Sequence, residues 1–342
     1  MSPPRVFAAL LALAPLLAAA GEGVQFAHGD WELACDNTRT CRAAGYSTQE
    51  DARSASVLIT RRAGPYQPPR LQLKVAQGED GPGVQGALRL RLAGKDHGAL
   101  QPAGDDGYRF NEAQSRTALL ALTRSGPLQV VDEAGTQWQV SDRGANAVLL
   151  KMDDVQGRVG TAAALIRKGD KGETSVLPAL AVPTLHNAAR GVQTTAADRA
   201  LARSPVLLQA VRQAQLPLHE SCWRYEDNAL QQDELQVQRL DANTLLVSAP
   251  CWMAAYNSGD AWWTMPDAAP YRLQLVSTDA NGYADGVLTA AHKGRGLGDC
   301  WSFQEWVWSG SDFASSRIAG TGDCRGEPGG FWDLPTLVTR VE

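Results

Sequence analysis

The most unusual local sequence of this chain is a glycine-rich stretch at residues 293–300 (KGRGLGDC). The backbone N–H groups of its three glycines, with Lys293 and Arg295 beside them, have the composition of an anion site. The glycine spacing differs from that of a P-loop. The residue types favour a structural loop over an anion site. In such a loop glycine supplies positive φ, and an Arg295–Asp299 ion pair holds the loop ahead of Cys300.

Tryptophan is the second feature, because eight of the ten tryptophans lie in the last third of the chain, at 223, 252, 262, 263, 301, 306, 308 and 332. Exposed aromatic side chains stack on sugars or anchor a protein partner. Trp262 and Trp263 are neighbours and point to opposite faces of a strand, so we expect one of them at the surface. Trp306 and Trp308 share a face. The alternative, expected for most of these tryptophans, is that they fill a small β core.

Signatures of catalysis are poor. Of the five histidines, His28 with Asp30 forms the one pair of a histidine and a carboxylate at strand spacing i, i+2, which permits a dyad. The motifs G-x-S-x-G, H-E-x-x-H and S-x-x-K are missing from the sequence. Asp153-Asp154 is interpreted as the solvated end of a helix. We therefore assign no catalytic residue, and an enzyme is the less favoured class.

Six cysteines occur, at 35, 41, 222, 251, 300 and 324. An even number in an exported chain indicates disulfides, and six cysteines allow fifteen connectivities. We favour the pairs that are closest along the chain: Cys35–Cys41, Cys222–Cys251 and Cys300–Cys324. The alternative is a metal site that adds His28 and Asp30 to Cys35. The five residues between Cys35 and Cys41 exceed the usual spacing of a zinc pair, so we predict no metal and no cofactor.

The first twenty residues have the pattern of a secretory signal peptide. Arg5 precedes an apolar stretch at residues 6–20, and small residues at 18–20 predict cleavage before Gly21. The alternative is a membrane anchor, but the stretch is short and Pro15 interrupts it. We therefore predict an exported protein that has no membrane span after signal cleavage.

The length and net charge of the chain restrict the class of protein and the kinds of partner that remain. The chain has 342 residues, a net charge of −5, 44% hydrophobic residues and 20% charged residues. These values are typical of a globular protein of about two domains. The mild acidity argues against a nucleic-acid partner, which would require a basic patch.

The elements that must position these residues are mostly strands. Alternating apolar residues predict a strand at 24–34, a hairpin closed by Cys35 and Cys41, and strands at 56–61, 71–75 and 87–92. Helices are predicted from Asn111 to Leu122 and after Ser141-Asp142, with strands at 128–131, 138–140 and 161–166. An Ala-rich helix at 195–203 and a second one after Ser204-Pro205 follow. Further strands are predicted at 235–240, 244–249, 271–276 and 304–308.

The fold prediction is mainly β with minority α (α+β): two disulfide-containing antiparallel β domains joined by a helical connector. After the signal peptide at 1–20, the domains predicted are an N-terminal β-rich domain with two helices at 21–169, a connector at 170–221, and a C-terminal domain rich in Trp and Cys at 222–342.

Several motifs together resemble one known family. They are residues 29–37 (GDWELACDN) with Cys41 and 44–46 (AGY), 150–158 (LKMDDVQGR), 250–251 (PC), 255–257 (AYN), 294–300 (GRGLGDC), 305–308 (EWVW) and 324–326 (CRG). They resemble bacterial envelope proteins grouped as domain of unknown function 1176. The first half is also similar to invasion-associated locus B proteins, in a Trp before a Cys pair and in residues 141–144. The first resemblance implies an exported, periplasmic protein of proteobacterial type, and it brings no known activity.

The sequence thus favours a non-enzymatic envelope protein that binds a macromolecule, either an envelope protein or a glycan. The predicted binding residues all lie in the last third: Tyr256, Asn257, Trp262, Trp263, Lys293, Arg295 and Asp299. Two alternatives stay open. One is a hydrolase or other enzyme that acts on envelope polymers through His28 and Asp30 or through Asp299. The other is a structural or stress-related envelope protein.

Overall fold

The computed structural model describes residues 23–49, 53–76, 83–104, 107–124, 126–218, 220–223 and 230–342. Over this part of the chain most regular structure is β-strand in antiparallel sheets, with a few short helices. The predicted fold class, mainly β with minority α, is confirmed. The predicted signal peptide lies outside the described residues.

A seven-stranded antiparallel sheet opens the fold. Its strands, in spatial order, are β1 (Val24–His28), β2 (Trp31–Cys35), β3 (Cys41–Tyr46), β4 (Ala55–Arg61), β5 (Arg70–Val75), β9 (Tyr108–Arg109) and β8 (Gln101–Pro102). Cys35 and Cys41 face each other across β2 and β3 and are joined by a disulfide. The predicted disulfide-closed hairpin is therefore confirmed.

A four-stranded sheet and two helices complete this half. The strands are β11 (Gln137–Val140), β10 (Leu128–Val131), β6 (Arg89–Leu92) and β7 (Lys95–Ala99), and the helices are α1 (Glu112–Thr123) and α2 (Ala145–Val155). The Asn111 side chain caps α1, as predicted, by accepting the N–H of Gln114. The predicted apolar stripe of α2 (Ala145, Val148, Leu149 and Met152) is buried in the core that both sheets share.

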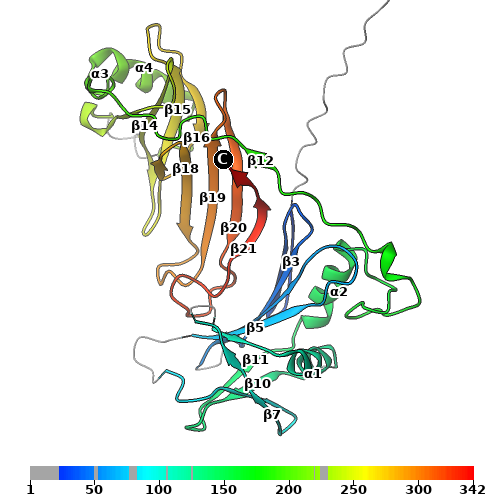
Figure 1. Cartoon of the computed structure of the whole chain (residues 1–342). Coiled ribbons are helices and arrows are strands. Elements are labelled where there is room, and N and C mark those ends of the chain that lie inside the picture. The colour runs from blue at the N-terminus through cyan, green and yellow to red at the C-terminus, as the bar shows by residue number, and fades with distance from the viewer. Residues whose placement is uncertain are drawn as a thin grey trace, which may run out of the picture.

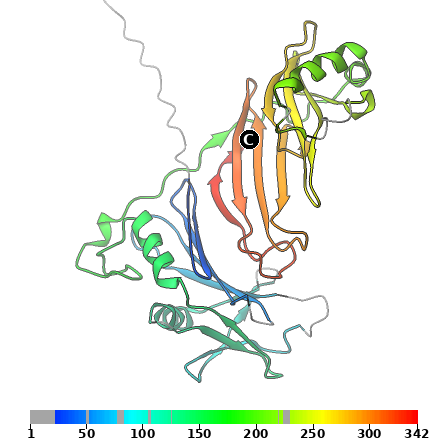
Figure 2. The ribbon, with the colours of Figure 1, turned by 180° about the vertical axis from the view of Figure 1, so that it is seen from behind.

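A connecting segment leads from α2 to the second half. It contains the 3-10 turns η2 (Glu173–Ser175) and η3 (Leu216–Leu218), the strand β12 (Thr184–Leu185), and the helices α3 (Ala196–Leu201) and α4 (Pro205–Gln215). Ser204 caps α4 and Pro205 occupies its first turn, as predicted. Seen from both sides, this green segment passes from the first sheet to the far end of the long C-terminal strands (Figures 1 and 2).

The second half consists of two further antiparallel sheets. The first, preceded by η5 (Gln232–Glu234), contains β13 (Gln236–Arg239), β14 (Thr244–Met253), β15 (Ser258–Pro266) and β16 (Gln274–Ser277). The second contains β17 (Gly282–Ala284), β18 (Val287–Lys293), β19 (Trp301–Trp308), β20 (Phe313–Gly320) and β21 (Leu334–Val338). The last strand, β22 (Arg340–Val341), pairs in parallel with β12.

The two halves meet through a small apolar cluster. Phe331, Trp332 and Leu334, which lie before and at the start of β21, pack against side chains of β2, β3 and β4 that include Tyr46 and Leu58. Figure 1 shows the loops at the lower ends of β19 and β20 reaching the sheet that holds β3 and β5. The C-terminal loops are thereby fixed on the N-terminal sheet.

Three predictions of local structure are wrong. Residues 24–34 form two paired strands instead of one, because Gly29 adopts a φ of +62° at the turn between them. Residues 161–166 do not form a strand, because the N–H groups of Leu165 and Ile166 donate to the Asp153 carboxylate. Asp153 is itself fully buried in the last turn of α2, so it is not part of a solvated helix end.

All six cysteines form disulfides, in the pairs Cys35–Cys41, Cys222–Cys251 and Cys300–Cys324. These are the pairs favoured from their proximity in sequence. None of the helices in the described part of the chain is long and apolar enough to cross a membrane.

Candidate functional site

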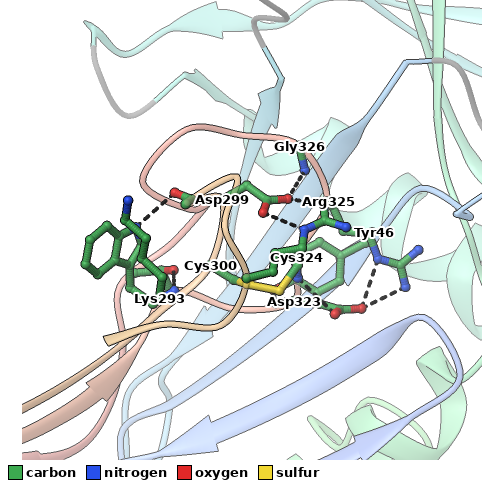
Figure 3. The surroundings of a disulfide bond; sticks show 12 residues. Tyr46, Lys293, Asp299, Cys300, Asp323, Cys324, Arg325 and Gly326 are labelled. Atoms are coloured by element: carbon green, nitrogen blue, oxygen red, sulfur yellow. Dashed lines mark hydrogen bonds and ion pairs between the residues drawn. A yellow bond between two sulfur atoms is a disulfide. The ribbon is translucent and has the colours of Figure 1, made fainter. Parts of the chain in front are cut away.

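The glycine-rich loop between β18 and β19 is held by an ion pair. Arg295 Nε donates to Asp299 Oδ1 at 2.7 Å, and a second guanidinium nitrogen donates to Oδ2. Asp299 is fully buried, and it also accepts the N–H of Gly326 at 2.6 Å (Figure 3). Gly298 has a φ of +70°. The guanidinium that an anion site would need therefore faces a carboxylate of the loop itself, as the ion-paired alternative predicted.

A second loop, residues 321–333 between β20 and β21, is joined to the glycine-rich loop by the Cys300–Cys324 disulfide (Figure 3). The backbone N–H of Gly329 also donates to the carbonyl of Gly298 at 2.9 Å. The two loops are thus fixed to each other by the disulfide, by this backbone hydrogen bond, and by the hydrogen bond from the Gly326 N–H to the Asp299 carboxylate. Such a unit loses little conformational entropy when it binds a partner.

The ion pair gives the loop a pH dependence. Hydrogen bonds from Arg295 hold the pKa of Asp299 below its usual value, so the carboxylate contributes stability above about pH 4, and this is lost as the pH falls. We expect Asp299→Asn to cost about 1–3 kcal/mol of unfolding free energy at pH 7. The difference from wild type should shrink as the pH is lowered from 5 to 2 in urea titrations. A difference that stays constant over this range would contradict the assignment.

The hairpin between β14 and β15 lies beside the glycine-rich loop. The Asn257 side chain donates to the carbonyl of Lys293 and accepts its N–H, both at 2.9 Å. The Tyr256 ring lies next to Gly296, where an added Cβ would be 3.6 Å from a ring carbon. The structure therefore brings together five of the predicted residues: Tyr256, Asn257, Lys293, Arg295 and Asp299.

Three of the exposed large apolar side chains of the described residues lie on these two loops. Met253 and Tyr256 of the hairpin are 50% and 46% exposed, and Leu297 of the glycine-rich loop is 69% exposed. Next to Leu297 a shallow hollow of about 370 Å³ is lined partly by Lys293 and Trp301. Met253 and Leu297 were missed in the sequence analysis, although an apolar residue between glycines in a polar loop is a usable signal.

The burial of the adjacent tryptophans Trp262 and Trp263 differs from the prediction. They point to opposite faces of β15, as expected, but Trp262 is 4% exposed and Trp263 is 1% exposed. Trp262 lies in the core between the two C-terminal sheets, and Trp263 lies in the core beneath α3 and α4. Because both faces of β15 are covered, the prediction that one of the pair is exposed is wrong. Neither ring is available to a ligand.

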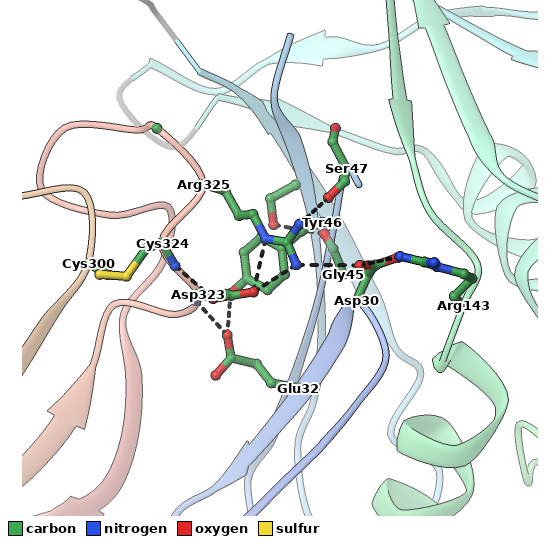
Figure 4. A network of polar contacts seen from close by, with 12 residues as sticks. Asp30, Glu32, Gly45, Tyr46, Ser47, Arg143, Cys300, Asp323, Cys324 and Arg325 are labelled. Atoms are coloured by element: carbon green, nitrogen blue, oxygen red, sulfur yellow. Dashed lines mark hydrogen bonds and ion pairs between the residues drawn. A yellow bond between two sulfur atoms is a disulfide. The ribbon is translucent and has the colours of Figure 1, made fainter. Parts of the chain in front are cut away.

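The proposed dyad of His28 and Asp30 is also not formed on one strand face. β1 ends at His28, and Asp30 lies in the turn that follows. The Asp30 carboxylate accepts from Arg143 at 2.9 and 3.1 Å and lies 3.4 Å from an Arg325 nitrogen (Figure 4). Asp30 therefore serves as a partner for two arginines.

Asp30 and Arg325 belong to a polar network that connects the two halves of the chain (Figure 4). Arg325 donates to the Ser47 carbonyl at 2.9 Å and to Asp323 at 2.9 Å. The Glu32 carboxylate accepts from the Tyr46 hydroxyl at 2.5 Å and from the Asp323 N–H at 2.8 Å.

The pKa values of Glu32 and Tyr46 and the backbone conformation of Gly322 reflect the close packing of this network. Burial raises the pKa of Glu32, and burial together with the Glu32 charge raises the pKa of Tyr46 well above its usual value. At neutral pH the Tyr46 hydroxyl is therefore protonated and donates a hydrogen bond to Glu32. Gly322 has a φ of +90°, and a Cβ there would lie 2.0 Å from the Tyr46 hydroxyl oxygen. These contacts have a structural role, because they hold the second loop on the N-terminal sheet.

One close group of His, Cys and acidic side chains is found among the described residues: Asp299, Cys300 and Cys324, whose ligand atoms lie within 4.8 Å. Metals bind cysteine as the thiolate, and both sulfurs are joined in a disulfide. Asp299 is already paired with Arg295. The chemistry of this group does not fit a metal.

Comparison with known proteins places the chain in a family. Residues 25–339 match the family model described as Protein of unknown function (DUF1176). The chain belongs to this family. It is also 26% identical over 329 residues to the uncharacterized protein YpfG of Escherichia coli (strain K12), covering 88% of each protein. No solved structure matches the chain significantly.

The family match confirms the first resemblance drawn from the motifs. The second, to invasion-associated locus B proteins, finds no support in these matches.

Proposed function

We propose that this DUF1176 protein is an exported, non-enzymatic protein of the bacterial cell envelope that binds a protein partner. The binding site is the contact surface, which we define as Met253, Tyr256 and Leu297 with Asn257 and Lys293 at its edge. The observation that carries this proposal is the exposure of three large apolar side chains on two adjoining loops that are rigidly held. Interfaces are enriched in Tyr and Met, and pre-organised loops bind at lower entropic cost.

The composition of the contact surface favours a protein over a glycan. The flexible Met side chain adapts to irregular apolar pockets and is over-represented at protein-binding surfaces. Sugars instead stack on broad aromatic faces. Trp262 and Trp263, which would have supplied such faces, are buried.

Export is supported by two observations. The chain forms three disulfides, which persist in oxidising compartments such as the bacterial periplasm. The first twenty residues have the charge and apolar pattern of a cleavable signal peptide.

A hydrolytic function is not favoured, because the carboxylates considered for it are already engaged. Asp299 pairs with Arg295, and Asp30 pairs with Arg143 and Arg325. Each is a poor general base, since the neighbouring cation lowers its proton affinity.

The test compares capture of an envelope partner by three forms of the full chain: wild type, Leu297→Glu and Leu275→Glu. Leu275 is the matched control, because it is 48% exposed on β16, outside the contact surface. We expect Leu297→Glu to reduce recovery of the partner at least about tenfold, since it places a charge in a desolvated contact. Leu275→Glu should recover it at the wild-type level. Equal recovery by all three forms would contradict the contact surface.

A further inference from the structure

A cavity in the N-terminal half of the chain is lined by none of the residues of the contact surface. Its volume is about 840 Å³, and it lies between β5, β9 and the first turns of α1. This is within the range of about 300–1,000 Å³ that holds small-molecule ligands. β5 and α1 are labelled in the lower half of Figure 1.

One part of the cavity lining is apolar and continuous with the hydrophobic core. Pro68 and Pro69 line it ahead of β5. Leu71 and Phe110 also line it and belong to the core cluster of the N-terminal half, while Leu119 of α1 packs partly buried against that cluster. The apolar part of a ligand in this cavity would therefore contact side chains that are packed into the hydrophobic core.

The other part of the lining is cationic. Arg70, Arg109 and Arg116 line the cavity, and Glu112 is the one acidic residue among its lining residues. Glu112 accepts from Arg116 at 2.5 Å, so it offsets one of the three arginines. Positive charge thus exceeds negative charge here, although the whole chain has a net charge of −5.

We propose that this cavity binds an amphipathic organic anion, with its apolar body on the proline, leucine and phenylalanine wall and its carboxylate or phosphate paired with the arginines. Arginine suits this role because its planar guanidinium donates in pairs to a carboxylate or phosphate and stays charged. The site is independent of the proposed function, since it lies on other elements and needs no protein partner.

The proposal is tested by calorimetric titration of the full mature chain with three probes below their micelle concentrations. Laurate and dodecyl phosphate are the anions, and dodecanol carries the same alkyl chain without charge. We expect saturable binding of at least one anion at one site per chain, and binding of dodecanol at least about tenfold weaker. Whichever anion binds more tightly identifies the preferred headgroup.

Two variants locate the binding. Arg70→Gln combined with Arg116→Gln should weaken anion binding at least about tenfold. Both side chains are exposed, so the fold should persist. Arg62→Gln is the matched control, because Arg62 is exposed and lies outside the cavity lining, and it should bind as wild type does. Absence of saturable anion binding, equal binding of dodecanol, or an unchanged affinity in the double variant would each overturn the proposal.

Discussion

Replacing Asp153 by alanine is expected to lower the free energy of unfolding by about 3–5 kcal/mol, because it leaves a buried arginine without its partner. Asp153 is fully buried and lies 3.3 Å from Arg61, whose side chain is almost fully buried. It also accepts the N–H groups of Leu165 and Ile166 at 2.7 and 3.1 Å. Burial lowers the pKa of Arg61 to about 10, which shows how dependent this cation is on its surroundings.

The neighbouring residue provides a matched control. Asp154 is exposed and pairs with Lys151 at 2.9 Å on the helix surface. Exposed ion pairs contribute little, so Asp154→Ala should change the unfolding free energy by no more than about 0.5 kcal/mol. Urea titrations of both variants at pH 7 make the comparison. Equal losses in the two variants would mean that the Arg61–Asp153 contact is not the source of stability.

Replacing Trp332 by alanine is expected to cost about 3–5 kcal/mol, because it removes a large side chain from the cluster that joins the two halves. Trp332 is 6% exposed and packs with Phe331 and Leu334 against the N-terminal sheet. Its indole N–H donates to the Ser56 hydroxyl at 2.7 Å. Lys74 Nζ lies 5.1 Å from its ring centroid.

Trp223 serves as the control, since it is 48% exposed. Trp223→Ala should change the unfolding free energy by about 0.5 kcal/mol or less, in line with most surface substitutions. Chemical unfolding followed by far-UV circular dichroism measures both variants. A loss for Trp332→Ala no larger than that for Trp223→Ala would show that the junction cluster does not stabilise the fold.

The sequence predicts local structure well wherever the cause is local. The Asn111 cap of α1, the buried stripe of α2 and the Ser204-Pro205 start of α4 each depend on residues within a few positions of one another. The disulfide-closed hairpin of β2 and β3 is predictable for the same reason. The domain boundaries at 169/170 and 221/222 stay predictions.

Long-range contacts explain the failures. Asp153 looks like a solvated helix end, but it is buried by Arg61, which is 92 residues away in sequence, and by the 161–166 segment that folds back on the helix end. Trp263 is buried because α3 and α4 of the connecting segment cover that face of β15. Alternation along a strand indicates that two faces exist, but it does not reveal whether another element covers the second face.

Several residues of the candidate site can be predicted from the sequence, but the full set of exposed residues that form the contact surface cannot. Lys293 and Arg295 are recognisable from the unusual glycine-rich sequence, and Tyr256 belongs to a motif of the family resemblance. The structure places all three on adjoining loops. The exposure of Met253 depends on which elements pack against the hairpin in the folded chain, and no sequence pattern encodes those contacts.

Site-specific photo-crosslinking in living cells tests whether a protein partner binds at the contact surface. A benzophenone amino acid would replace Tyr256 in one strain and Leu275 in another, in the full-length chain. We expect one discrete protein adduct from position 256, none from position 275, and loss of the adduct when Leu297→Glu is added. The same adduct from both positions, or no adduct from position 256, would contradict it.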